Sequence, residues 1–277
     1  MTDIKTGINQ RGLLVDKHSV SFRMYGRGFR QYDLEVIHEL SIELHPGEIV
    51  AIAGASGSGK SVLAHSILGI LPDNAFTTGA VYYDGRPLDQ KTKEIFRGRR
   101  ITLIPQSVNY LDPLMTVGAQ LISPAPGDGG RALRREKAAA LLERYGLAAE
   151  VMDYYPHQLS GGMARRVLVA SAAACPAELI IADEPTPGMD KKAVEETIRL
   201  FKQLAGEGRG IMLITHDIEM AVLTASRVAV FRDGTVIETV PAAAFSGDGS
   251  ALGHPFTRAL YRALPQNGFS GDFKEAV

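Results

Sequence analysis

Short runs of apolar and β-branched residues, separated by turn signals, dominate the first hundred residues of the chain. These runs occupy residues 13–22, 35–44, 49–53, 80–83 and 101–104. Pro-Gly, Asp-Asn and Asp-Gly dipeptides fall between several of them, and such dipeptides are typical of turns. The pattern predicts β structure wrapped around a central buried strand at residues 49–53.

The hydrophobic period then lengthens and indicates helices. Residues 62–71 predict an amphipathic helix that ends at Pro72, and residues 116–166 are helical in pattern around a Pro- and Gly-rich insertion at 124–130. Two further buried strands are predicted at 179–182 and 211–215.

The helix between these last two strands places Val194, Ile198, Phe201 and Leu204 on one face. Strand, helix and strand therefore alternate again after the helical stretch. We expect an α/β core with an all-helical insert, followed by a short tail after Val240.

Composition narrows the class of protein. The 277 residues are 45% hydrophobic, enough for one large domain or one domain with a subdomain. Thirty basic and thirty-one acidic side chains give a net charge of -1, so we expect no nucleic-acid partner. We interpret the basic cluster of Arg97, Arg99 and Arg100 as a solvated face.

The single cysteine, Cys175, excludes an internal disulfide and any multi-cysteine metal site. We expect a reducing compartment, with Cys175 as a small buried residue. No apolar run reaches the length of about 18 residues that a membrane span needs, and residues 1–10 lack the apolar core of a signal peptide. These features predict a cytoplasmic chain.

Residues 54–61 read Gly-Ala-Ser-Gly-Ser-Gly-Lys-Ser, directly after the strand predicted at 49–53. A glycine-rich turn between a strand and a helix points successive backbone N–H groups into one hollow, which suits phosphate. The pattern is a P-loop for a nucleoside triphosphate, in which a lysine binds phosphate and a serine hydroxyl reaches magnesium. The predicted cofactor-binding residues here are Gly54, Ser56, Gly57, Gly59, Lys60, Ser61 and Val62.

Two adjacent carboxylates end the buried strand at 179–182. Asp183 is expected to reach the magnesium shell through a bridging water. Glu184 lies one residue closer to the γ-phosphate, where a carboxylate can orient and deprotonate the attacking water.

Leu159-Ser160-Gly161-Gly162-Met163 opens a predicted helix, and its glycines form a second anion-binding corner. The P-loop, Gln106 after a strand, this segment, the paired carboxylates and His216 after a strand occur in one order. That order resembles the ATP-binding subunits of ABC transporters over nearly the whole chain. The resemblance implies an α/β fold class, a P-loop NTPase core of ABC type with an antiparallel β subdomain and an inserted α-helical subdomain.

The resemblance implies ATP and Mg²⁺ as cofactors and a role for each matching residue. Gln106 resembles the Q-loop glutamine, which touches magnesium or water. Ser160 and Gly162 resemble the signature that closes on the γ-phosphate of the opposite subunit's ATP. His216 resembles the switch histidine, and Asp190 the D-loop aspartate. Catalytic roles then fall to Glu184, His216 and Gln106, and metal binding to Ser61, Gln106 and Asp183.

The chain departs from the family pattern in two places. Met163 replaces the glutamine that commonly ends the signature, and Arg165 stands where a glutamine is frequent. The D-loop reads Pro187-Gly188-Met189-Asp190 in place of Ser-Ala-Leu-Asp. Neither change removes a phosphate ligand, but both leave open whether the two composite ATP sites turn over equally.

The adenine-stacking aromatic is not fixed by the pattern. The family uses an aromatic on a loop before the second strand, and counting back from Leu40 and Ile42 favours Tyr32. Tyr25 and Phe29 are the alternatives.

The tail carries the indication of cargo. His254-Pro255-Phe256-Thr257 resembles the His-Pro-Tyr-Thr segment near the end of peptide and nickel importer ATPases. We expect residues 1–240 to form the ABC ATPase domain, with its helical insert at about 107–166, and residues 241–277 to form a short tail of that subgroup. The tail lacks a cysteine cluster that many peptide-importer subunits carry, which favours nickel or a metal chelate over peptide.

Three classes of function remain in view at this point. The first is the energising subunit of an importer, with two transmembrane permease subunits, a second similar ATPase subunit or second copy, and an extracytoplasmic solute-binding protein. It would lie at the cytoplasmic face of the inner or plasma membrane, held there through the permeases. The others are a soluble ABC ATPase acting on DNA or ribosomes, and an accessory protein built on the same cassette.

Overall fold

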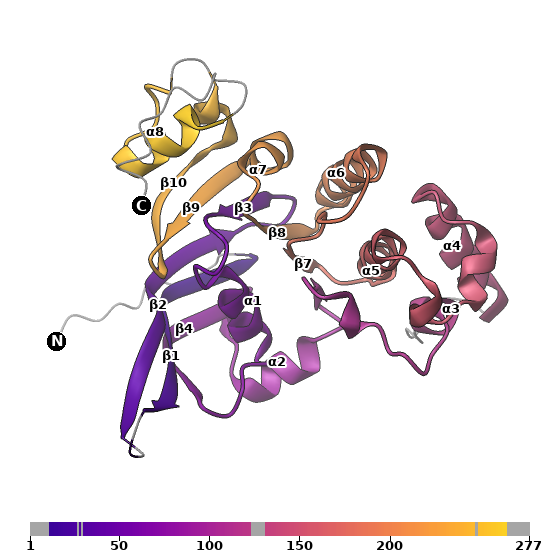
Figure 1. Cartoon of the computed structure of the whole chain (residues 1–277), viewed down its shortest axis with the longest axis horizontal. Coiled ribbons are helices and arrows are strands. Elements are labelled where there is room, and N and C mark those ends of the chain that lie inside the picture. Colours follow the sequence, from indigo (N-terminus) through magenta and orange to yellow (C-terminus); the bar gives the residue numbers. More distant parts are fainter. Residues whose placement is uncertain (1–10, 27, 29, 123–130, 247–248, 265–277) are drawn as a thin grey trace.

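The strands form two sheets (Figure 1). The structure is a computed structural model that describes residues 11–26, 28, 30–122, 131–246 and 249–264. The larger sheet has the order β10-β9-β3-β8-β7-β6. Its strands are Ile49–Ala53 (β3), Ile101–Ile104 (β6), Leu179–Asp183 (β7), Gly210–Thr215 (β8), Arg227–Arg232 (β9) and Thr235–Pro241 (β10). All neighbours pair in parallel except β10, which is antiparallel to β9.

The smaller sheet is antiparallel and has the order β2-β1-β4-β5. Its strands are Leu13–Tyr25 (β1), Gln31–Leu44 (β2), Ala75–Tyr83 (β4) and Arg86–Pro87 (β5). Strands β1 and β2 form a long hairpin whose far end projects from the body of the molecule (Figure 1).

Helices cover the larger sheet and form a separate lobe beside it (Figure 1). They are Lys60–Leu68 (α1), Gln90–Phe96 (α2), Val117–Leu121 (α3), Arg131–Arg144 (α4), Gly161–Ala174 (α5), Lys191–Gly206 (α6), Ile218–Thr224 (α7) and Pro255–Arg262 (α8). None of the helices in the described ranges is long and apolar enough to cross a membrane.

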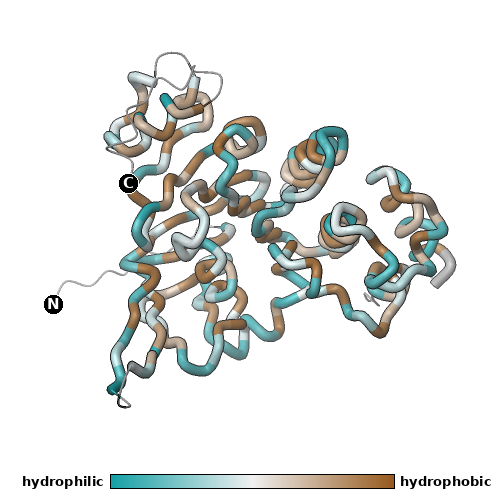
Figure 2. Tube along the Cα trace, viewed as in Figure 1, coloured by the Kyte–Doolittle hydropathy of each residue, from teal (hydrophilic) through white to brown (hydrophobic). Residues whose placement is uncertain are grey.

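The core lies on both faces of the parallel sheet. Strands β3, β7 and β8 are buried along their full length, as expected where both faces are covered. Val50 and Ile52 pack in a cluster with α1 and the smaller sheet, whereas Ala51 and Ala53 belong to the cluster that holds α5, α6 and α7. In Figure 2 hydrophobic stretches follow these central strands. Because β3, β8 and β7 pair in parallel, their C-terminal ends lie at one edge of the sheet.

The predicted strands at 49–53 and 101–104 match the structure, and the others are longer than predicted. Strand β4 begins at Ala75, five residues early, and β9 and β10 were not predicted. The helix predicted at 62–71 runs instead from Lys60 to Leu68, because Gly69 adopts a left-handed conformation (φ 67°) that closes it before Pro72. The insertion predicted at 124–130 lies outside the described residues.

The basic cluster lies at the surface: Arg99 is exposed, and the side chains of Arg97 and Arg100 are 35% and 37% exposed. Arg100 is also paired there, because its Nη2 lies 2.8 Å from the Asp84 carboxylate and bonds Glu178, and its guanidinium lies 4.9 Å from the Tyr83 ring centre. The prediction of a buried Cys175 was wrong, since this residue is partly exposed, with its Sγ 3.4 Å from the Gly98 carbonyl oxygen.

The tail folds back onto β10. The Glu238 carboxylate accepts hydrogen bonds from the backbone N–H groups of Gly253 (2.7 Å) and His254 (3.2 Å). The Arg232 guanidinium lies 4.4 Å from the ring centre of Phe256, at the start of α8. These contacts fix the His-Pro-Phe-Thr segment against the larger sheet.

Candidate functional site

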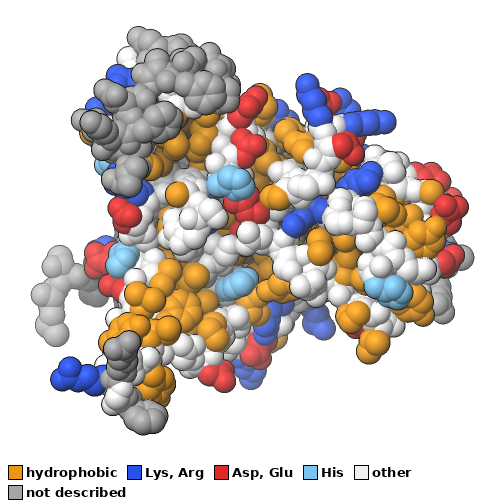
Figure 3. Space-filling view, in the orientation of Figure 1, with side chains coloured by type: hydrophobic (Ala, Val, Ile, Leu, Met, Phe, Trp, Pro, Cys, Tyr) orange, Lys and Arg blue, Asp and Glu red, His pale blue; other side chains and the backbone are white. Residues whose placement is uncertain are grey.

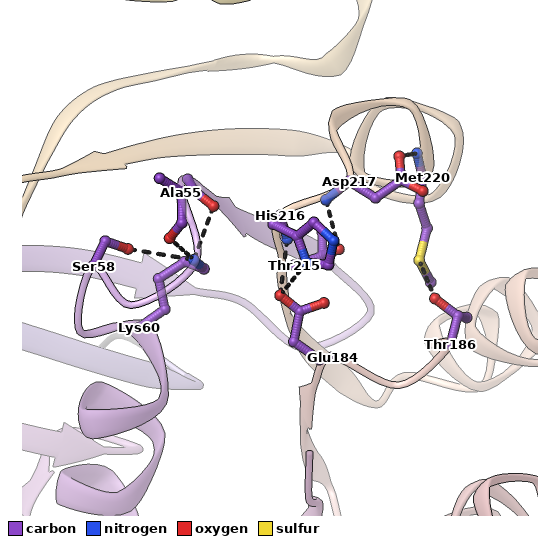
Figure 4. A network of polar contacts seen from close by, with 10 residues as sticks. Ala55, Ser58, Lys60, Glu184, Thr186, Thr215, His216, Asp217 and Met220 are labelled. Atoms are coloured by element: carbon purple, nitrogen blue, oxygen red, sulfur yellow. Dashed lines mark hydrogen bonds and ion pairs between the residues drawn. The ribbon is translucent and has the colours of Figure 1, made fainter. Parts of the chain in front are cut away.

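The glycine-rich loop between β3 and α1 surrounds a buried lysine. The Lys60 ammonium donates to the carbonyl oxygens of Gly54 (2.8 Å) and Ala55 (2.6 Å) and lies 3.3 Å from the Ser58 hydroxyl (Figure 4). Burial lowers the pKa of Lys60, while the charges of Glu184 and Asp183 oppose that shift. A lysine charge is therefore held at the mouth of the loop, where phosphate oxygens would replace its carbonyl partners.

The other loop residues frame this lysine. Ser56 and Gly57 are exposed, Gly54 is buried, and Gly59, Ser61 and Val62 are half-buried. The loop thus offers exposed backbone at its tip and a closed base beneath it, the form of an anion-binding hollow.

Strand β7 delivers Asp183 to the same edge of the sheet. Burial raises the pKa of Asp183, an effect opposed by its hydrogen bond with the Ser61 hydroxyl and by the charge of Lys60. Its Oδ1 atom is buried without a hydrogen-bond partner among the described residues. An unpaired buried carboxylate oxygen beside a serine hydroxyl fits the oxygen ligands that Mg²⁺ prefers.

Glu184 and His216 form a directly bonded pair. The Glu184 Oε1 atom accepts a hydrogen bond from the His216 backbone N–H (3.0 Å) and lies 2.8 Å from His216 Nδ1 (Figure 4). The pairing of β7 with β8 places the two residues together, since they follow the ends of these neighbouring strands. Glu184 is buried, and its φ of 47° is unusual for a residue other than glycine, as occurs at functional sites.

The signature residues lie at the start of α5. Ser160 caps the helix, with its Oγ atom accepting from the Met163 backbone N–H at 3.3 Å. A Cβ added to Gly162 would lie 2.9 Å from the Gly188 carbonyl oxygen, whereas one added to Gly161 would meet open space. The signature therefore touches the D-loop of its own chain, while Asp190 caps the next helix, α6.

Gln106 is exposed just beyond the end of β6. Strand β6 pairs in parallel with β7, so this end lies next to the strand that carries Asp183. The preceding residue, Pro105, accepts a hydrogen bond from the buried Arg165 guanidinium on α5. In the sequence, Arg165 stands out only as a departure from the family pattern. Its inward orientation was not predicted, because no local sequence pattern indicates it.

The adenine-stacking residue stays a prediction. Tyr32 is half exposed and lies within β2, opposite Met24, so the expected position on a loop was wrong. Further along β2, the Val36 side chain comes within 2.9 Å of a Cβ built on Gly59, so β2 passes beside the P-loop. Tyr25 is exposed and accepts a hydrogen bond from Gln31, and Phe29 lies outside the described residues.

The structure thus brings the P-loop lysine together with the two carboxylates, the P-loop serine and the histidine, in the arrangement of a P-loop nucleoside-triphosphate-binding protein. A family profile described as ABC transporter matches residues 37–187. The chain belongs to the ABC transporter family, as an ATP-binding subunit whose ATP hydrolysis is coupled to transport.

Its similarity to known proteins extends along most of the chain. The dipeptide transport ATP-binding protein DppD of Escherichia coli (strain K12) is 36% identical over 268 residues, covering 92% of this chain and 78% of that protein. The probable peptide ABC transporter ATP-binding protein y4tR of Sinorhizobium fredii is 35% identical, covering 91% and 77%. The dimeric ATP-binding cassette MJ0796 bound to ADP and Pi superposes with a TM-score of 0.72 at 29% identity, covering 83% of this chain and 98% of that one.

Proposed function

We propose that this chain energises the import of peptides. The observation that carries the proposal is its similarity to DppD and y4tR over more than nine-tenths of its length, both named for dipeptide or peptide transport. The absence of a cysteine cluster from the tail favoured nickel as cargo. The two relatives are named for dipeptide or peptide transport, and neither name mentions nickel. Peptide is therefore the cargo class that we favour.

The roles proposed for the site residues follow from their contacts. Lys60 binds the β- and γ-phosphates, and the loop N–H groups between Gly54 and Val62 cradle them. Ser61, Asp183 and Gln106 would hold Mg²⁺, which supplies charge neutralisation at the phosphates. Glu184 accepts the proton of the attacking water, and His216 holds that carboxylate while facing the γ-phosphate.

The helical lobe offers a surface for the permease subunits. Several large apolar side chains are exposed in residues 107–166 of the described chain, namely Tyr110, Leu114, Met115, Leu133 and Tyr155. Leu114 is 86% exposed, and Figure 3 shows hydrophobic side chains at the surface of this lobe. Exposed apolar groups in the segment that follows Gln106 suit contact with a membrane protein. We propose that the chain is held at the cytoplasmic face of the membrane in this way.

The complete system then contains two permeases, a second ATPase subunit or a second copy, and an extracytoplasmic solute-binding protein. We also propose the domain division at residue 240, with the tail from 241 acting as an appendage of the ATPase domain. The bonds that Glu238 makes to Gly253 and His254 support such an appendage, because they anchor the tail next to that boundary.

The cargo is tested with a transporter assembled in lipid vesicles from this chain and its proposed partners, namely two permeases, the second ATPase subunit and the solute-binding protein. We expect ATP hydrolysis to rise several-fold when the binding protein carries a dipeptide or oligopeptide, and not when a nickel chelate is supplied. Stimulation by the nickel chelate alone would reverse the assignment of cargo.

Permease docking is tested separately by co-purification. We expect Leu114→Asp to reduce recovery of the permeases, because it places a charge in an apolar contact. Leu223→Asp is the control, since Leu223 is 55% exposed on α7, outside the helical lobe. Equal recovery with both variants would show that the permeases dock elsewhere, and an absence of permeases with the parental chain would favour a function outside transport.

A further inference from the structure

Arg165 is a charged side chain in a buried position, where a charge is less stable than in water. Only 8% of the residue is exposed, and its Nη1 donates a 2.9 Å hydrogen bond to the carbonyl oxygen of Pro105. Its Nε is buried without a hydrogen-bond partner among the described residues. A buried cation raises the free energy of the folded chain unless nearby groups compensate its charge.

The compensation comes from the catalytic carboxylates. Burial lowers the pKa of Arg165, and the negative charges of Asp183 and Glu184 oppose that shift. The guanidinium therefore lies within electrostatic reach of both acids while its hydrogen bond goes to the residue before Gln106. One side chain of the signature helix thus reaches two other parts of the site.

The next arginine on the same helix points elsewhere. Arg166 donates to the carbonyl oxygens of Gly162 (3.3 Å) and Tyr145 (3.1 Å), at the start of α5 and just beyond α4. Successive helical residues are about 100° apart around the axis, which separates these two contacts. Arg166 ties α5 to its own lobe, whereas Arg165 ties α5 to the end of β6.

We propose that Arg165 is a positioning residue that fixes the Pro105–Gln106 segment to the signature helix, so that the two move together when the subunit closes on nucleotide. The proposal rests on the roles given to Gln106 and Ser160 above. In this arrangement, when the helical lobe moves, the hydrogen bond from Arg165 to Pro105 carries Gln106 along with α5. The position of Gln106 relative to Asp183 and Glu184 then changes, and so does the distance from the Arg165 charge to these two acids.

A spin label on Asn109 reports the link without any need for activity. Asn109 is exposed three residues after Gln106, and its replacement by cysteine in a Cys175→Ala background leaves one thiol. We expect Arg165→Met to increase the mobility of this label and Arg165→Lys, which retains a cationic donor, to restore most of the parental signal. Arg166→Met is the matched control, because it removes a guanidinium from the adjacent position and should leave the label unchanged.

Kinetics of the transporter complex give the second readout. We expect Arg165→Met to lower kcat about ten- to a hundredfold, the range for a misplaced catalytic group, while KM for ATP stays within about twofold. Arg165→Lys should recover most of kcat, which a loss of folded protein would not explain. Thermal unfolding of each variant establishes that it is folded, and Arg165→Gln, two bonds shorter and neutral, provides the same comparison where Arg165→Met does not fold.

The outcomes separate this inference from the function on which it rests. Equal label mobility in the Arg165→Met and Arg166→Met chains, or no rescue by Arg165→Lys, would overturn the positioning role. Unaltered ATP hydrolysis in Lys60→Ala and Glu184→Gln chains would instead overturn the assignment of the site itself.

Discussion

At the scale of single residues, the site depends on a few buried charges whose partners lie on different elements. Lys60 comes from α1, Asp183 from β7 and Glu184 from the turn after β7, and each influences the ionisation of another. The interactions are local enough that single substitutions can test them one at a time.

Replacing Lys60 tests nucleotide binding. Lys60→Ala removes a charged contact worth about 1.5 to 3 kcal/mol, so affinity for ATP should fall roughly ten- to a hundredfold. Lys202→Ala removes an exposed lysine from α6 and serves as the control. Calorimetric titration that finds equal ATP affinity in the parental and Lys60→Ala chains would reject the binding site.

Replacing Glu184 separates binding from chemistry. Glu184→Gln keeps the size of the side chain and an oxygen that can accept from the His216 amide, but removes the basic carboxylate. We expect ATP to bind as before and turnover to fall about 10²- to 10⁴-fold, the contribution of a positioned general base. Glu219→Gln, an exposed carboxylate on α7, should leave turnover unchanged. A Glu184→Gln chain that hydrolyses ATP at the parental rate would show that another group is the base.

At the scale of elements, the start of α5 depends on a close approach of two backbones. Gly162→Ala would place a methyl group 2.9 Å from the Gly188 carbonyl oxygen, so we expect the free energy of unfolding to fall by about 1 to 3 kcal/mol. Gly161→Ala, whose added methyl meets open space, should be neutral or stabilising by up to about 1 kcal/mol. Urea denaturation measures the free energy of unfolding of both variants. Equal losses would show that the close approach of Gly162 to Gly188 does not restrict the side chain at position 162.

A partly buried ion pair joins the two sheets. Arg227 at the start of β9 bonds both oxygens of Glu48 (2.6 and 3.0 Å) and the Glu43 carbonyl oxygen on β2 (3.0 Å). Burial alone would raise the pKa of Glu48, but the hydrogen bonds from Arg227 and from the His45 backbone hold that pKa below its ordinary value. The pair should therefore stabilise the fold above the ordinary glutamate pKa of 4.5 and lose that contribution as pH falls below it.

We expect Arg227→Met to lower the free energy of unfolding by about 1.5 to 3 kcal/mol at pH 7. The difference from the parental chain should shrink in unfolding experiments as pH falls through the range below 4.5, because protonated Glu48 no longer needs a cation. Arg135→Met, which removes an exposed pair with Asp153, should cost about 0 to 1 kcal/mol. A pH-independent effect of Arg227→Met would mean that packing, not charge, accounts for it.

The sequence predicted those elements whose pattern is local. Strands β3 and β7 and the loop at residues 54–61 could be located because a buried parallel strand is a continuous apolar run and a P-loop has fixed spacing. The end of α1 at Gly69 and the early start of β4 depend on strand pairing and packing between distant parts of the chain, which a short stretch of sequence does not reveal. The inward path of Arg165 and the bond between Glu184 and His216 could not be predicted for the same reason, since each joins residues far apart in sequence.

At the scale of the whole molecule, the P-loop and the signature are carried by different lobes. Lys60 lies at the base of α1 over the larger sheet, whereas Ser160 starts α5 in the helical region (Figure 1). If the signature completes the ATP site of a second subunit, as the resemblance of Ser160 and Gly162 implies, one chain alone lacks a complete site.

The isolated chain should therefore hydrolyse ATP poorly when dilute. We expect the rate per chain to rise with protein concentration or on addition of the partner subunit, because two subunits must enclose each ATP. Turnover measured across a dilution series, with light scattering to follow association, provides the test. Vigorous hydrolysis that stays strictly proportional to protein at the lowest concentrations would contradict a shared site.

The bond between Glu184 and His216 also limits how the carboxylate can be used. Oε1 already receives the His216 amide and faces its ring, so Oε2 is the oxygen left to take a proton from water. A carboxylate held at one oxygen is restricted in rotation, so the direction of Oε2 depends on where the His216 main-chain amide lies. A shift of the backbone after β8 would therefore re-aim the base while leaving in place every residue that we assign to ATP binding.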